Sequence, residues 1–204
     1  MAVKEDDLTL KVCVMGDEKT GKTSFVRRML DDTFSEEPQP YDNPAVTKEI
    51  TYEGNKIMLT VMDQQGDDSG MTATFFNNAN MVAAVCSYKS KDSLNNCKNW
   101  LSYGDRYIGG DYLKSLIVTF SDEETKEFTK EEAQTVATNV NAQLFEISSK
   151  TGDNTKETYN EIMKLLNAKF IAVTAANQKG GKKGKEKKDA KDKKDGKSGK
   201  CLLL

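Results

Sequence analysis

The stretch Leu8–Leu30, LTLKVCVMGDEKTGKTSFVRRML, joins three patterns that together decide the fold. The largely apolar run Leu8–Met15 predicts a buried strand, and Thr23–Leu30 has the pattern of a helix. Between them, GDEKTGKTS (Gly16–Ser24) fits the spacing G-x-x-x-x-G-K-S/T of a phosphate-binding loop. Because a loop that opens a helix can direct several backbone N–H groups at one anion, we predict a phosphate site here.

Each residue type in this loop has a chemical role. Lys22 adds a positive charge near the terminal phosphates of a bound nucleotide, and the Thr23 hydroxyl can bind Mg²⁺. Backbone N–H groups converge on the phosphate oxygens. Nucleotide contacts are therefore predicted for Glu18, Lys19, Thr20, Gly21, Lys22, Thr23 and Ser24.

The rest of the body alternates strand and helix patterns. Further strands are predicted over 45–52, 56–62, 81–87, 115–119 and 143–147, with a hairpin-like turn at Gly54-Asn55. Further helices are predicted over 72–77, 90–107, 129–140 and 153 to about 176. This alternation predicts an α/β fold: a doubly wound, mostly parallel six-stranded sheet with helices on both faces. Such sheets bind ligands at the carboxyl ends of their strands.

The charge distribution separates a nucleotide-binding body, residues 1–176, from a tail, residues 177–204. The stretch Lys179–Lys200 holds eleven lysines and four acidic residues, a net charge of +7, whereas the whole chain carries −2. The rest of the chain therefore carries −9. A polar stretch of this kind cannot bury an apolar core, so we expect the tail to be disordered.

The composition also excludes several classes of site. The sequence has no histidine, which rules out a Ser-His-Asp triad, a histidine general base and a histidine metal site. No run of about 18 apolar residues occurs, and the acidic start MAVKEDD does not resemble a signal or transit peptide. We therefore expect a cytosolic chain with reduced thiols and no membrane span.

Three polar motifs follow predicted strands: DQQG (Asp63–Gly66), TFSD (Thr119–Asp122) and ISSKTG (Ile147–Gly152). Each motif alone could be an ordinary acidic turn, helix N-cap or polar loop. In this order after a phosphate loop, they resemble the Ras superfamily of small GTPases over residues 8–176. An ATP-using phosphate-loop enzyme is the weaker alternative, because no lid or acceptor site is recognisable. The resemblance implies GDP or GTP and Mg²⁺ as ligands.

At the phosphate end, the resemblance implies that Asp63 reaches Mg²⁺ through water and that the Gly66 amide senses the γ-phosphate. The family's switch threonine corresponds to Tyr41 in an ungapped reading and to Thr47 in a gapped one. Neither residue belongs to the family's usual Pro-Thr pair.

For catalysis, the resemblance implies Lys22 and the residue after D-x-x-G. Two departures from the family pattern bear on this step. The residue after D-x-x-G is Asp67 instead of the glutamine that orients the attacking water. Glu18 occupies a loop position that is usually small in the family. Both acids would place negative charge near the triphosphate, so we predict slow hydrolysis of GTP. A GDP- or GTP-binding scaffold without hydrolysis is the alternative.

At the base end, the resemblance implies that Asp122 accepts hydrogen bonds from guanine and that Phe34 packs edge-on against the base. The Ser149 amide would meet the guanine carbonyl oxygen, within a loop that comprises Ser148, Ser149 and Lys150. Thr119 and Phe120 replace the family's Asn and Lys. These replacements predict a looser grip on the base.

The C-terminal CLLL is typical of a prenylated C-a-a-X box at Cys201. One lipid chain with a polybasic stretch makes a two-signal anchor, so we expect attachment to the cytoplasmic face of a membrane. FFNNANMVAAV (residues 75–85) and DSLNNCKNW (residues 92–100) look like Rab sequences, although CLLL also suits the Rho and Ras branches. The resemblance implies effectors, exchange factors and a monomer, and no specific nucleic acid.

Overall fold

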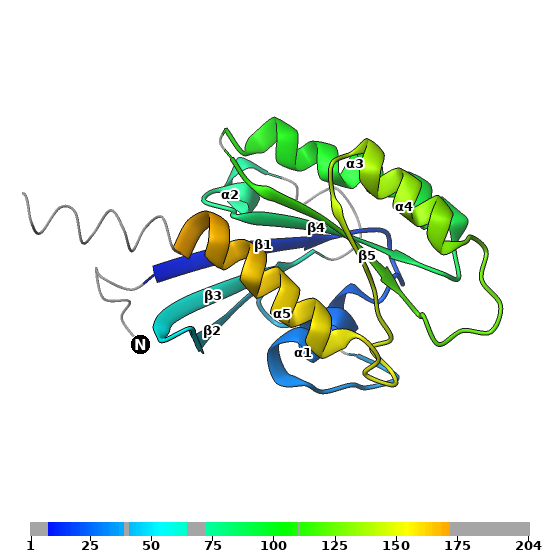
Figure 1. Cartoon of the computed structure of the whole chain (residues 1–204), viewed down its shortest axis with the longest axis horizontal. Helices are drawn as coiled ribbons and strands as arrows, with labels where there is room; N and C mark the ends of the chain where they lie inside the picture. Colours follow the sequence, from blue (N-terminus) through cyan, green and yellow to red (C-terminus); the bar gives the residue numbers. More distant parts are fainter. Residues whose placement is uncertain (1–7, 39–40, 65–71, 110, 172–204) are drawn as a thin grey trace, which may run out of the picture. The chain divides into compact units, whose positions relative to one another are not determined.

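Six strands form one sheet in the computed structural model, which describes residues 8–38, 41–64, 72–109 and 111–171 (Figure 1). The strand order is β2-β3-β1-β4-β5-β6. The strands are β1 (Leu8–Met15), β2 (Ala45–Tyr52), β3 (Asn55–Asp63), β4 (Met81–Ser87), β5 (Leu113–Thr119) and β6 (Gln143–Glu146). Only the β2–β3 pair is antiparallel among these strands, so the predicted doubly wound, mostly parallel sheet is confirmed.

The β2–β3 hairpin turns one residue earlier than the sequence suggested. Tyr52 pairs with Asn55, which leaves Glu53 and Gly54 as the two turn residues. Their φ angles are 47° and 78°, both in the left-handed region that a type I′ turn requires. Asn55 instead begins β3, because its backbone continues the antiparallel ladder.

Helices cover both faces of the sheet, as predicted. Helices α1 (Lys22–Asp31) and α5 (Thr155–Leu166) pack together on one face. The other face carries α2 (Ala73–Phe76), α3 (Lys91–Tyr107) and α4 (Lys130–Asn139) (Figure 1). No helix among the described residues is both long and apolar enough to cross a membrane.

Local side-chain chemistry sets several helix boundaries. A capping box between Thr129 and Glu132 opens α4 and confirms the predicted start. The last helix begins at Thr155 and not at Asp153, because Asn154 has a left-handed φ of 57°. The α-helix ends at Leu166, where a second structural unit of the chain starts with a π-helical turn, η1 (Asn167–Ile171). Residues from 172 onward lie outside the described part of the chain.

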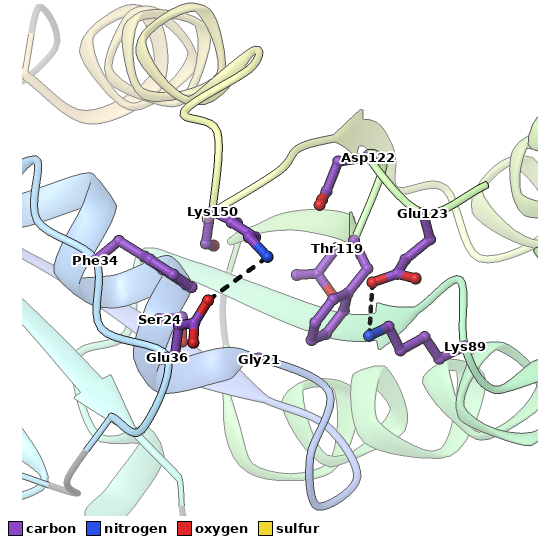
Figure 2. A pocket seen from close by; sticks show the side chains of 11 residues that line it. Gly21, Ser24, Phe34, Glu36, Lys89, Thr119, Asp122, Glu123 and Lys150 are labelled. Atoms are coloured by element: carbon purple, nitrogen blue, oxygen red, sulfur yellow. Dashed lines mark ion pairs between the residues drawn. The ribbon is translucent and has the colours of Figure 1, made fainter. Parts of the chain in front are cut away.

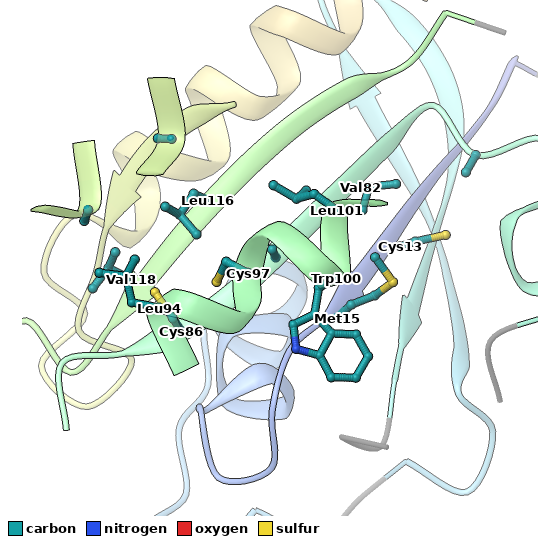
Figure 3. Close-up of a cluster of buried hydrophobic side chains, with 14 of the residues drawn as sticks. Cys13, Met15, Val82, Cys86, Leu94, Cys97, Trp100, Leu101, Leu116 and Val118 are labelled. Carbon is teal, nitrogen blue, oxygen red and sulfur yellow. The ribbon is translucent and has the colours of Figure 1, made fainter. Parts of the chain in front are cut away.

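Strand β4 is buried along its whole length and anchors the core. Its side chains alternate between the two faces of the sheet, and one face packs against α3 (Figure 3). Burial of such side chains contributes about 1.5–3 kcal/mol each. Cys13 of the neighbouring strand β1 is also buried, and this burial raises the pKa of its thiol to about 12. The cysteines Cys13, Cys86 and Cys97 are free thiols. This packed core holds the carboxyl ends of the strands in fixed relative positions.

Candidate functional site

Two adjoining cavities lie where the parallel strands end. The first, the loop cavity, has a volume of about 470 Å³ and is lined by residues such as Glu18, Lys22, Thr23 and Gln64. The second, the ring cavity, has a volume of about 180 Å³ and contains Asp122, Ser149 and Lys150 in its wall (Figure 2). The two cavities share Gly21, Ser24, Phe34, Glu36 and Phe120. Together they can hold an elongated ligand with two chemically different ends.

The phosphate loop wraps around the side chain of Lys22. Lys22 is buried, and its Nζ donates a hydrogen bond of 2.7 Å to the carbonyl oxygen of Asp17. Burial lowers the pKa of Lys22, while the carboxylates of Asp63, Asp17 and Glu18 act in the opposite direction. Helix α1 begins at Lys22 without a side-chain cap, since its N-cap residue is Gly21. The first N–H groups of α1 and a lysine therefore serve the loop cavity, an arrangement that favours an anion.

Asp17 ties this loop to helix α3. One carboxylate oxygen accepts a 2.7 Å hydrogen bond from Nε1 of Trp100, and the other accepts a 2.8 Å bond from Nδ2 of Asn96. This role of Asp17 could not be predicted, because a bond to a helix about 80 residues away leaves no local pattern in the sequence. The available signal was a second carboxylate, next to Glu18, in a loop expected to bind an anion. Through this residue, α3 helps to fix the shape of the loop.

An oxygen-rich pair lies beside Lys22. The Thr23 hydroxyl donates a 2.7 Å hydrogen bond to Oδ2 of Asp63, a fully buried residue. Oδ1 of Asp63 has no hydrogen-bond partner among the described residues. Burial raises the pKa of Asp63, whereas the Thr23 bond, Lys22 and Arg27 lower it. A hydroxyl and a carboxylate with one unsatisfied oxygen fit the ligand preference of Mg²⁺, so these two residues suit that ion.

The two candidates for the switch position lie in different surroundings. The guanidinium carbon of Arg27 lies 4.7 Å from the centroid of the Tyr41 ring. The buried hydroxyl of Tyr41 has no hydrogen-bond partner among the described residues. Burial raises the pKa of Tyr41, and the Asp63 carboxylate acts in the same direction. Thr47 lies in β2, exposed, with its hydroxyl 2.9 Å from that of Thr60. Tyr41 is therefore the candidate within electrostatic range of Asp63.

Thr119 joins the loop after β5 to the phosphate loop. Its hydroxyl lies 2.6 Å from the carbonyl oxygen of Thr20 and 2.9 Å from that of Cys86. The threonine hydroxyl thereby connects three segments in the buried interior. The looser grip on the base that was expected from Thr119 in place of asparagine stays a prediction. Asp122 is exposed at the wall of the ring cavity.

Arg28 of α1 fixes the loop after β6. Its Nε donates a 2.6 Å hydrogen bond to the carbonyl oxygen of Ser149, and NH2 donates a 3.1 Å bond to that of Lys150. Ser148 Oγ accepts a 3.0 Å bond from the Thr151 amide. Ser149 is buried, and its Oγ has no hydrogen-bond partner among the described residues. This role of Arg28 could not be predicted, because its position in the sequence is that of an ordinary helix residue.

Most of the predicted site residues come together. Residues at the walls of the two cavities include Glu18, Lys19, Gly21, Lys22, Thr23, Ser24, Phe34, Thr119, Phe120, Asp122, Ser149 and Lys150. Glu18 is exposed and borders the loop cavity, so its charge adds negative potential there. Gly66, Asp67 and Cys201 lie outside the described residues.

The sequence of this chain matches one family model and several relatives of known family. The family model described as Ras family matches residues 11–168, which include every site residue named above except Cys201. Ras-related protein RabH of Dictyostelium discoideum is 26% identical over 76% of this chain and 80% of its own length. Ras-related protein Rab-18 of Lymnaea stagnalis is 29% identical over 80% of this chain and 83% of its own length. Ras-related protein Rab-1 of Theileria parva is 29% identical over 82% of this chain and 78% of its own length.

Proposed function

Since this chain belongs to the Ras family and is a Rab-like small GTPase, we propose that it is a membrane-anchored molecular switch. It binds GDP or GTP with Mg²⁺, hydrolyses GTP slowly and acts in membrane traffic or signalling. The observation that supports this best is the pairing of two adjoining cavities. One cavity has Lys22 and Thr23 in its wall, with the buried Asp63 hydrogen-bonded to Thr23, and the other has Asp122 and Ser149 in its wall.

The loop cavity holds the phosphates in this proposal. N–H groups at the start of α1 donate to phosphate oxygens, and Lys22 balances the terminal phosphate charge. Thr23 and Asp63 are the residues that would hold Mg²⁺, which neutralises phosphate charge when bound. Lys22 is already positioned by the Asp17 carbonyl, so its side chain has little conformational freedom left to lose on binding.

The ring cavity holds the base. Asp122 can accept hydrogen bonds from the ring N–H and the amino group of guanine, which adenine does not offer in the same pattern. The Ser149 amide provides a donor for the guanine carbonyl oxygen. Because an unpaired polar group penalises the wrong base, this pair favours guanine over adenine.

Hydrolysis of GTP to GDP and phosphate is proposed to be slow. Attack by water needs an oriented nucleophile and neutralised charge on the γ-phosphate. An ionised Asp67 can only accept hydrogen bonds and has the sign of the phosphate. The exposed carboxylate of Glu18 adds a second negative charge at the loop cavity. A scaffold that binds nucleotide without hydrolysis is the second candidate, and a single-turnover measurement with bound GTP separates the two.

The base assignment gives the main test of the function. GDP is expected to bind more tightly than ADP, and Asp122→Asn is expected to shift preference from guanine towards xanthine nucleotides. The amide can donate to the additional carbonyl of xanthine, whereas the carboxylate only accepts. Titration calorimetry with GDP, ADP and XDP measures both effects. Glu124→Gln, an exposed acid two residues away, is the matched control and should behave as wild type. Equal affinity of the wild type for GDP and ADP would contradict the guanine assignment.

The tail is proposed to attach the protein to a cytoplasmic membrane face through a prenyl group on Cys201 and the lysines before it. Each lysine near an anionic surface contributes about 1 kcal/mol, and a lipid chain adds about 0.8 kcal/mol per buried CH₂. Cys201→Ser is therefore expected to leave only salt-sensitive association with membranes. Fractionation of cells at low and high salt measures this, and a variant that fractionates as wild type does at both would refute the lipid anchor. Effectors and exchange factors are the proposed protein partners, and a monomer is the proposed state.

A further inference from the structure

A tyrosine at the end of β4 is bonded to a carboxylate of the edge strand β6. Tyr88 follows β4 directly, and its hydroxyl donates a hydrogen bond to Oε1 of Glu146, the last residue of β6. Nζ of Lys130, at the start of α4, forms an ion pair with Oε2 of the same carboxylate. Because β5 lies between β4 and β6 in the sheet, the Tyr88 side chain reaches past the end of a whole strand to make this bond. Neither Tyr88 nor Glu146 is among the residues that line the two cavities.

Tyr88 also lies at both ends of the loop after β5. Its N–H donates a 3.2 Å hydrogen bond to the carbonyl oxygen of Thr119, the last residue of β5. Its own carbonyl oxygen accepts a 2.9 Å bond from the N–H of Glu127. The loop after β5 therefore begins and ends beside Tyr88, and this loop contains Asp122.

The loop after β6 is joined to the same place. Ile147 follows Glu146, and its N–H donates a 2.9 Å hydrogen bond to the carbonyl oxygen of Val118. The carbonyl oxygen of Ile147 accepts a 3.1 Å bond from the N–H of Ser121. Ser149, in the wall of the ring cavity, is two residues further along the chain. A shift of β6 would therefore move Ser149 relative to the loop after β5.

We propose that Tyr88 is a positioning residue for base recognition: through Glu146, its hydroxyl fixes the separation between the loop that presents Asp122 and the loop that presents the Ser149 amide. Figure 2 shows Asp122 and Lys150 on these two loops. Strand β6 has four residues and lies at the edge of the sheet, where it pairs with β5. That pairing fixes β6 relative to β5, and the Tyr88 bond adds a direct link to β4. This inference rests on the proposed nucleotide-binding function.

The bond lies in a buried, packed environment. Tyr88 is 1% exposed, and the side chain of Glu146 is 15% exposed. The Phe128 ring stacks on the Tyr88 ring with centroids 4.8 Å apart, and Nζ of Lys126 lies 4.2 Å from the Tyr88 centroid. Burial acts to raise the pKa of Glu146, but hydrogen bonds from Lys130 and Tyr88 lower it overall. The carboxylate is therefore ionised at neutral pH and accepts a charge-assisted hydrogen bond, which is stronger than a neutral one.

The chain contains a second tyrosine with the same chemistry and no link to the cavities. The hydroxyl of Tyr112 donates a 2.6 Å hydrogen bond to Oδ1 of Asp105, which also forms a 2.7 Å ion pair with Lys114. Tyr112 precedes β5, so it lies at the opposite end of this strand from the loop that contains Asp122. None of the three residues lines either cavity. Tyr112 is therefore a matched control for Tyr88.

The test compares Tyr88→Phe with Tyr112→Phe in the full chain, titrated with GDP, ADP and inorganic triphosphate. Tyr88→Phe keeps the packed ring and removes only the hydroxyl. We expect it to lower GDP affinity about five- to thirtyfold, because the hydrogen bonds to guanine depend on the separation of the two loops. Affinities for ADP and triphosphate should stay as in wild type, so the preference for GDP over ADP falls by the same factor. Tyr112→Phe should leave all three affinities unchanged.

Urea unfolding of the same proteins separates positioning from stability. Both phenylalanine variants lose a hydrogen bond to a carboxylate, so both unfolding midpoints should fall, whereas the preference for GDP should fall only in Tyr88→Phe. Glu146→Ala removes the acceptor and should lower this preference to the same extent, and adding Tyr88→Phe to it should have no further effect. Glu146→Gln keeps an acceptor oxygen and should retain the wild-type preference. The two Glu146 variants decide the question if Tyr88→Phe does not fold.

The outcomes distinguish this inference from the function on which it rests. If the wild type prefers GDP and Tyr88→Phe keeps the same preference, the positioning role is wrong and the function stands. If Tyr88→Phe loses GDP, ADP and triphosphate equally, or if Tyr112→Phe lowers the preference as much, the bond only supports the folded state and the inference is also wrong. If the wild type binds no nucleotide, or binds GDP and ADP equally, both the proposed function and the inference fail.

Discussion

Gly16→Ala is expected to destroy nucleotide binding and to destabilise the fold. A methyl group at this position would lie 2.2 Å from the Val85 carbonyl oxygen and 3.1 Å from the Val85 carbonyl carbon. Both atoms belong to the backbone of β4 and cannot rotate away. Gly16 also has a φ of 152°, which residues with a side chain rarely adopt. Overpacking and backbone strain cost about 1–3 kcal/mol each, so we expect a loss of about 2–6 kcal/mol in unfolding free energy.

The matched control is Gly54→Ala in the β2–β3 hairpin. Gly54 also has a left-handed φ, of 78°, but a methyl group there would have no atom within 4 Å. An alanine at this position would therefore have a strained backbone but no steric clash, at a cost of about 1 kcal/mol. Urea unfolding and GDP titration of both variants measure the effects, and we expect an affinity loss of at least about a hundredfold for Gly16→Ala alone. Wild-type affinity in Gly16→Ala would show that the loop and β4 are not in contact as described.

Lys22→Met is expected to lower GDP affinity by about a hundredfold, because Lys22 is proposed to bind the phosphates and a hydrogen bond to a charged group contributes about 1.5–3 kcal/mol. The nucleotide-free variant should nevertheless be at least as stable as wild type. Burial lowers the pKa of Lys22, so the folded state holds this charge less readily than the unfolded chain does. Met fills similar space without a charge. Lys98→Met, at an exposed lysine of α3 that lines neither cavity, is the control and should change neither quantity substantially.

The pH dependence gives this prediction a second readout. A lysine whose pKa is lower in the folded state loses its proton there first, so stability of the wild type rises with pH between the folded pKa and the ordinary lysine pKa. Any stability advantage of Lys22→Met should therefore shrink as the pH rises through that window. Thermal unfolding of the nucleotide-free proteins across alkaline pH measures it. An unfolding temperature of Lys22→Met well below wild type at neutral pH would contradict the expected sign.

Much of the fold could be predicted because its signals are local. Strands β1, β2 and β4 have the predicted bounds, since apolar or alternating runs end at turn residues. The capping box of α4 is likewise contained within four residues. The hairpin turn was misplaced by one residue because both Gly54 and Asn55 favour turns, and only strand pairing decides between them.

The candidate site could be predicted only where a local sequence motif indicates the chemical role of its residues. Thr23 and Asp63 belong to such motifs, and the structure joins them at 2.7 Å. Asp17 and Arg28 do not, because their partners are a helix and a loop far along the chain. The two buried contacts of the Thr119 hydroxyl likewise leave no local pattern, and the predicted looser grip on the base stays a prediction.

The bonds from Arg28 to the Ser149 and Lys150 carbonyls also have a consequence for folding kinetics. They join residues 121 and 122 positions apart, and Thr119 meets Thr20 across 99 positions. Contacts with such long sequence separation must close large loops and form slowly. During synthesis, the phosphate loop leaves the ribosome long before its partners, so the cavities can form only on a nearly complete chain. Nucleotide should therefore bind only after the chain is nearly complete. It should stabilise folded full-length molecules and have no stabilising effect on truncated ones.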